Sequence, residues 1–153
     1  MVKALDVAKM FLFWAKEDGD IITNLKLQKL LYYAQAWHLV NYGRRLFMDE
    51  IEAWDFGPVV KTIYHKWKKY GSTPIPYEIT GKEADQFSEP KLKFLQELYR
   101  IYSNFSATQL VSMTHGEKPW KESFNKGQNV VISTKLMKEY YSELYDKQYG
   151  KEG

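Results

Sequence analysis

The residues of this sequence most able to do chemistry are three histidines: His38, His65 and His115. They lie too far apart for H-E-x-x-H or another short ligand spacing, and the chain has no cysteine to complete a zinc site. His38 follows a tryptophan in an apolar segment, which is typical of a buried, satisfied histidine. We therefore predict no metal site and no cofactor.

Motifs for nucleophilic catalysis and phosphate binding are also absent from the sequence. It contains no G-x-S-x-G elbow, no P-loop and no G-x-G-x-x-G fingerprint. The acids Asp49, Glu50, Glu52 and Asp55 lie close together, but such groups are typical of solvated loops. His115, near a turn, is the candidate general base for a cryptic enzyme acting on a nucleotide or peptide. Because no residue completes a catalytic set around His115, we favour a non-catalytic role and predict that the protein is not an enzyme.

The stretch EAWDFGPVV, residues 52–60, combines aromatic residues, an acid and a Gly-Pro break. Gly57 and Pro58 are expected to open a helix, because proline at the first helical position loses no hydrogen bond. The residues before them are bulky and lack helical periodicity: Trp54, Asp55 and Phe56. They either cover the core or belong to a face offered to a partner.

Lysines recur on the helix expected after Pro58: Lys61, Lys66, Lys68 and Lys69. Such a face can bind nucleic-acid phosphates. The lysine face can instead be the solvated side of a helix whose other side buries Ile63 and Trp67. We favour the solvated side, since the net charge is only +3 and no helix-turn-helix pattern accompanies the lysines. A nucleic-acid-binding prophage regulator remains the alternative function.

Helical periodicity dominates the elements that would position these residues. Thr23 and Asn24 are both N-cap candidates for a long amphipathic helix ending at Gly43, with Lys26, Lys29 and Gln35 on its outer side. Further helix starts are expected at a capping box of Ser106 and Gln109, and at Ser133. A short helical segment is expected over residues 82–87, and extended chain over residues 130–132. We predict a mainly α fold: a compact irregular helical domain of about six to seven helices, with at most a minor β element near residues 44–56.

Length and composition favour one domain over residues 1–153. No apolar run approaches the ~20 residues of a membrane span, so we expect a soluble, cytoplasmic protein without membrane contact. Five Trp, twelve Tyr and eight Phe exceed what a core of this size can hide. Some should reach the surface, where aromatic residues anchor protein contacts. This favours a binding module.

Several blocks occur in a specific order along the chain: KLQKLLYYAQAW from Lys26, EAWDFGPVV from Glu52 and MTHGEKPW from Met113. In this order they resemble the Panacea, or SocA-like, antitoxin domain, also known as phage-associated or GepA-like protein, over roughly residues 5–141. The resemblance implies a helical antitoxin that neutralises a cognate protein toxin, encoded nearby, by direct contact. It also implies, from the founding member, delivery of the toxin to a ClpXP-type protease. The resemblance leaves the toxin and the oligomeric state unknown.

Residues within these blocks are the candidates for partner binding or for the family signature. We expect Gly57-Pro58 and Pro119-Trp120 to shape the chain. Lys29 is a candidate either for an interface or for an internal pair with a carboxylate. The candidates are Gln28, Lys29, Trp54, Asp55, Phe56, Gly57, Pro58, His115 and Trp120.

Overall fold

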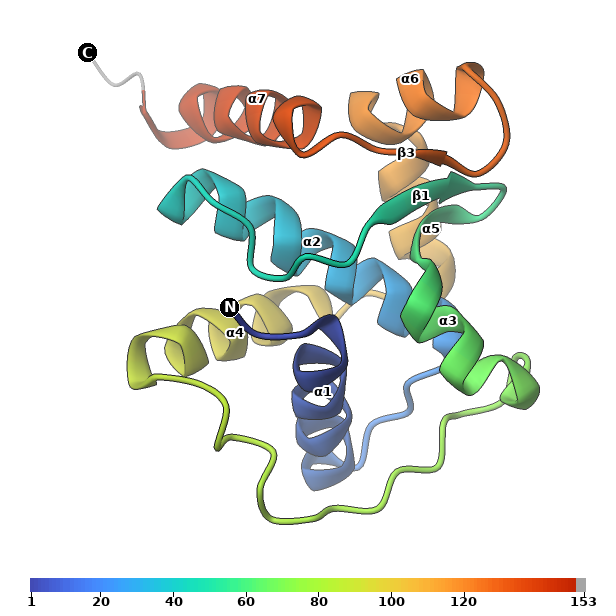
Figure 1. Ribbon diagram of the computed structural model, residues 1–153, viewed down its shortest axis with the longest axis vertical. Helices are drawn as coiled ribbons and strands as arrows, with labels where there is room; N and C mark the ends of the chain where they lie inside the picture. The colour runs from blue at the N-terminus through green and yellow to red at the C-terminus, as the bar shows by residue number, and fades with distance from the viewer. Residues whose placement is uncertain (151–153) are drawn as a thin grey trace.

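The computed structural model describes residues 1–150 and shows seven α-helices and a small sheet in that range (Figure 1). The predicted mainly α fold with a minor β element is confirmed. The elements are α1 (Ala4–Asp18), α2 (Asn24–Tyr42), β1 (Ile51–Trp54), β2 (Gly57–Val60), α3 (Lys61–Trp67), the 3₁₀ turn η1 (Lys68–Tyr70), α4 (Glu89–Tyr102), α5 (Ala107–His115), α6 (Lys118–Asn125), β3 (Val130–Val131), α7 (Thr134–Tyr145) and the π-helical turn η2 (Asp146–Gly150).

Helix α2 runs through the middle of the molecule, with α7 along one side, α1 and α4 on the other, and the β1–β2 hairpin near one end (Figure 1). The predicted amphipathic character of α2 is therefore wrong. Lys29 and Gln35 are buried, at 0% and 1% exposure. The polar atoms of Gln35 bond to backbone instead: its amide donates to the Phe47 carbonyl at 2.8 Å, and its oxygen accepts from Leu46 N–H at 2.7 Å. His38 is buried as predicted, with Nδ1 at 2.7 Å from the Arg44 carbonyl.

Local signals located the helix starts correctly. Of the two candidates for the cap of α2, Thr23 is the cap: it accepts a hydrogen bond from Lys26 N–H. Ser133 accepts one from Leu136 N–H, as expected. Ser106 and Gln109 form the predicted capping box, each side chain accepting from the other residue's N–H. Each of these contacts joins atoms only three residues apart in the sequence. They therefore form independently of what packs against the helix.

The sheet has the order β2-β1-β3, and both neighbouring pairs are antiparallel. The extended chain predicted over residues 130–132 is confirmed at Val130 and Val131, which pair with β1. The predicted helix start at Gly57-Pro58 is wrong. Pro58 lies in β2 opposite Ala53, and α3 begins at Lys61. Proline is tolerated there because β2 is an edge strand with one side of its backbone unpaired.

The expected helical segment over residues 82–87 is also wrong, since these residues form turns. Glu83 explains the difference: its carboxylate accepts hydrogen bonds from Thr80 N–H at 2.7 Å, Gly81 N–H at 3.0 Å and the Tyr77 hydroxyl at 2.7 Å. A side chain that satisfies nearby backbone groups in this way competes with helix formation.

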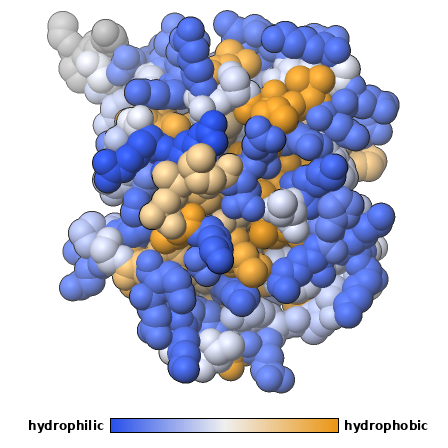
Figure 2. All heavy atoms as spheres, in the orientation of Figure 1, coloured by the Kyte–Doolittle hydropathy of each residue, from blue (hydrophilic) through white to orange (hydrophobic). Residues whose placement is uncertain are grey.

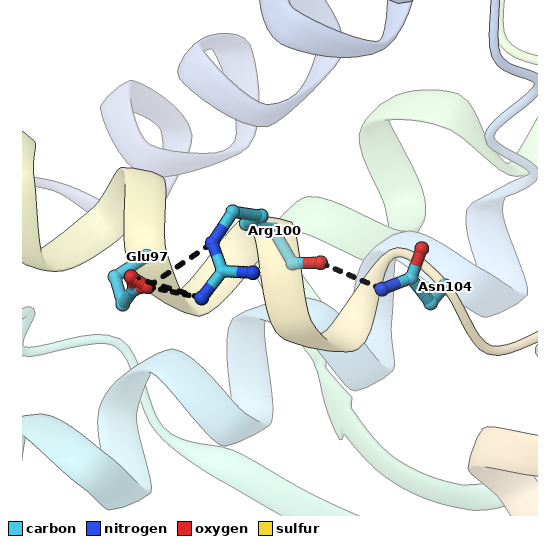
Figure 3. A network of polar contacts seen from close by, with 3 residues as sticks. All are labelled: Glu97, Arg100 and Asn104. Carbon is cyan, nitrogen blue, oxygen red and sulfur yellow. Dashed lines mark hydrogen bonds and ion pairs between the residues drawn. The ribbon is translucent and has the colours of Figure 1, made fainter.

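The surface carries mostly charged and polar residues. Figure 2 shows one face, on which hydrophilic residues predominate and hydrophobic side chains appear in small separate groups. On α4, Arg100 Nε donates to Glu97 at 3.1 Å and the Asn104 amide donates to the Arg100 carbonyl at 3.0 Å (Figure 3). Exposed pairs of this kind contribute little to stability. Within residues 1–150, none of the helices combines the length and apolar character needed to cross a membrane.

Candidate functional site

The end of the β1–β2 hairpin projects two residues into solvent. Asp55 and Phe56 form the turn, and 67% of Phe56 is exposed. Trp54 is half-buried: its indole N–H donates to Glu52 at 2.9 Å, and its ring packs edge-on against Tyr64 with centroids 4.9 Å apart. We call residues 54–57 the hairpin tip. Phe56 is therefore free to make a contact, although single exposed apolar side chains are ordinary and Ile21 and Met48 are exposed to a similar degree, at 65% and 59%.

Two aromatic side chains hold the tip from behind. The Trp120 indole N–H of α6 donates to the Trp54 carbonyl at 2.8 Å. His115 of α5 places Nε2 at 2.9 Å from the Asp55 carbonyl, so that nitrogen must carry the proton. The two rings stack with centroids 4.0 Å apart. His115 is therefore engaged in positioning the turn, and the predicted corner at Trp120 is part of the same contact.

Helix α2 holds the adjoining strand in the same way. Gln28 accepts from Val60 N–H at 2.8 Å and donates to the Asn24 side chain at 2.9 Å. Lys29 Nζ donates to the Pro58 carbonyl at 3.1 Å. These bonds satisfy the free side of an edge strand, where unpaired backbone groups are costly once buried.

The candidate pair between Lys29 and an internal carboxylate is wrong. Its side chain is fully buried, and no ion pair of Lys29 occurs among residues 1–150. Burial lowers the pKa of the ammonium to about 7. Its methylenes lie against Gly57, where an added Cβ would come within 2.5 Å of Lys29 Cε and 2.9 Å of Thr114 Oγ1. Glycine at 57 thus makes room for the lysine.

A groove of about 440 Å³ opens beside the tip. Its walls include apolar side chains from α2, the hairpin and α3, with one lysine at the rim: Leu25, Trp54, Phe56, Val59, Tyr64 and Lys68. We call it the tip groove. The structure therefore places Trp54, Asp55 and Phe56 on the surface, and Gln28, Lys29, His115 and Trp120 behind them.

The four predicted lysines are all exposed, as the solvated-face interpretation requires: Lys61, Lys66, Lys68 and Lys69. Only Lys68 lines the tip groove. As for metal ligands, residues 1–150 contain no group of three or more His, Asp and Glu side chains arranged so that they could hold a metal ion. Gln28, Lys29, His115 and Trp120 each make a hydrogen bond to the hairpin backbone, which suits them to positioning a surface.

Sequence reasoning missed Glu117. Its carboxylate accepts from the hydroxyls of Tyr33 at 2.8 Å and Tyr141 at 2.7 Å, and Tyr141 also bonds to Tyr32 at 2.9 Å. Burial raises the pKa of this carboxyl. The network joins α2, α7 and the start of α6, and so fixes the helix that carries Trp120. Paired tyrosines on α2 and α7 were the available signal, because buried hydroxyls require partners.

Replacing Trp120 with phenylalanine is expected to lower the free energy of unfolding by about 1–2 kcal/mol. Phenylalanine can keep the stack on His115 but leaves the Trp54 carbonyl without its donor. Urea unfolding measures the loss. Trp14→Phe is the control, because Trp14 packs against Phe11 and Tyr99 away from the hairpin. Equal losses in the two variants would mean that ring volume, rather than the hydrogen bond, is responsible.

Comparisons with known proteins show which family this chain resembles. The model of the family described as antitoxin SocA-like, Panacea domain, matches residues 27–121. The curated protein Antitoxin SocA of Caulobacter vibrioides is 32% identical over 155 residues, covering 92% of this chain and 82% of that protein. No solved structure matches the chain significantly. The matched segment includes the hairpin tip and the residues that hold it.

Proposed function

This chain belongs to the SocA-like Panacea antitoxin family, and from that premise we propose that it neutralises a protein toxin by binding it directly. The toxin is expected to be the product of an adjacent reading frame, and the two proteins to meet in the cytoplasm. The single domain over residues 1–153 would act as the binding module.

We place the contact at the hairpin tip and the tip groove. The observation that carries this choice is the exposure of Phe56 on a turn whose backbone is held by side chains from α5 and α6. An aromatic residue on a rigid support loses little conformational entropy when it binds, and aromatic anchors dominate many protein interfaces. Side chains bonded to the backbone behind the tip would then preserve its shape.

Phe56→Ser is the variant that tests this placement. Because Phe56 is exposed, the change should leave the melting temperature unaltered while weakening the complex with the adjacent gene product at least about tenfold. In cells that co-express the toxin, growth rescue should be lost. Met48→Ser is the matched control: Met48 is 59% exposed and lies in the connection before β1. If Phe56→Ser still rescues growth, the tip is not the contact.

Delivery to a ClpXP-type protease is a separate hypothesis, since binding alone can neutralise a toxin. It predicts that the toxin's half-life shortens when this protein is present and recovers in cells without the protease. An unchanged half-life would leave direct blocking as the mechanism.

A further inference from the structure

A second pocket, of about 390 Å³, lies where the N-terminal residues, the connection after α2 and the start of α4 meet. Three basic side chains line it: Arg44, Arg45 and Lys91. The rest of its lining within residues 1–150 is neutral polar or apolar, without an acidic residue, and it shares no residue with the tip groove. We call it the basic pocket.

The buried ring of His38 fixes the ammonium of Lys91 beside this pocket. His38 Nδ1 lies 2.7 Å from the Arg44 carbonyl, so Nδ1 carries the proton and Nε2 is left to accept. The Lys91 ammonium donates to that Nε2. It also lies 5.0 Å from the ring centre of Tyr42. A neutral imidazole and an aromatic face thus hold the charge of Lys91 in place without cancelling it.

The positive charges around the pocket repel one another. Burial lowers the pKa of Lys91, and the charge of Arg44 lowers it further. Burial also lowers the pKa of His38, and the charges of Lys91 and Arg44 act in the same direction. A fold that gathers such charges against their repulsion, at the edge of a pocket, offers a site for an anionic ligand.

The acids closest to the pocket in the sequence do not line it. Asp85 and Glu89 flank the start of α4, and both are exposed outside the lining. Asp49, four residues after Arg45, accepts instead from the Ala4 N–H at 3.3 Å and the Thr62 hydroxyl at 2.7 Å. The two ion pairs found in residues 1–150 include none of the three basic residues. The charge of the lining itself is therefore positive.

We propose that the basic pocket binds the phosphate group of a small molecule, as in a nucleoside monophosphate. Such a group carries a charge of about −1.5 to −2 at pH 7 and presents three acceptor oxygens. Guanidinium groups bind these oxygens in pairs, and Lys91 adds an ammonium that is already fixed. A free phosphate ion would leave much of the 390 Å³ unfilled. Val2, Leu46 and Phe87 offer apolar contact to the group that carries the phosphate.

Calorimetric titration with adenosine monophosphate tests the proposal, with inorganic phosphate and adenosine as partial ligands, at about 20 mM salt to limit screening. The monophosphate should bind, inorganic phosphate should bind at least about threefold more weakly, and adenosine should give no signal. Arg44→Ala/Arg45→Ala should weaken binding of the monophosphate at least about tenfold. The control is Lys66→Ala/Lys69→Ala, which removes two positive charges from exposed positions outside the pocket and should weaken binding less than about twofold. Equal melting temperatures of the two variants would show that both are folded.

The other outcomes are distinct. If neither phosphate compound binds, or if both double variants weaken binding equally, the proposed site is wrong. If inorganic phosphate binds as tightly as the monophosphate and both are lost with Arg44→Ala/Arg45→Ala, the phosphate site stands and the attached group is wrong. Single-stranded DNA that binds more tightly with length and is lost only in that variant, while the monophosphate does not bind, would assign the pocket to nucleic acid. None of these measurements involves the toxin, so the site stands or falls independently of the proposed neutralisation.

Discussion

Replacing Gly57 with alanine is expected to lower the free energy of unfolding by about 2–4 kcal/mol, from two separate causes. The backbone of Gly57 has φ 105°, which side chains rarely adopt. An added Cβ would also lie 2.5 Å from Lys29 Cε and 2.9 Å from Thr114 Oγ1. Since Lys29 is fully buried, its methylenes have little room to move.

Gly81→Ala separates the two causes. Gly81 has φ 85°, and an added Cβ there would meet no atom within 4 Å. It should therefore show the backbone effect alone, about 1 kcal/mol. Urea unfolding of both variants gives the difference that belongs to the crowded contact. Combining Gly57→Ala with Lys29→Ala should recover part of the loss, because the shortened side chain vacates the space. Equal losses at Gly57 and Gly81, or strict additivity in the double variant, would contradict the close approach.

Replacing Lys29 with methionine is expected to raise the free energy of unfolding at pH 7 by about 1–3 kcal/mol. Burial lowers the pKa of the folded-state ammonium from 10.5 to about 7. Between these values the unfolded chain holds a proton that the folded chain releases, so wild-type stability rises with pH by up to about 1.4 kcal/mol per unit. Below pH 7 both states are charged and the full cost of burial remains. Methionine removes that cost, and the lost bond to the Pro58 carbonyl offsets part of the gain.

The pH dependence is the decisive measurement. Urea unfolding at about pH 7, 8 and 9 should show the advantage of Lys29→Met shrinking as pH rises, before tyrosines titrate. Lys66→Met is the control for removing one positive charge from an exposed position. Parallel curves for the wild type and Lys29→Met would mean that Lys29 has no depressed pKa. A loss of stability at pH 7 would mean that the bond to Pro58 outweighs the burial of the charge.

The sequence alone predicts those features of this protein whose causes are local. The caps at Thr23, Ser106 and Ser133 each depend on atoms three residues apart. The helix starts expected at Ser106 and Ser133 are correct, and Thr23 is the cap of the pair of candidates, Thr23 and Asn24. The ordered blocks also identify the family, because their residue types and spacing are specific without any knowledge of contacts. The mainly α fold follows from helical periodicity in the same way.

Tertiary structure decides where the polar residues of those blocks lie. Lys29 and Gln35 follow the pattern of a solvated helix face, yet α2 is enclosed by elements from both halves of the chain. Gln28, Lys29, His115 and Trp120 meet at one hairpin only because α2, α5 and α6 converge there. Periodicity records which residues share a face of one helix. Whether that face meets water or another backbone depends on packing between distant segments, and here that packing leaves the tip exposed.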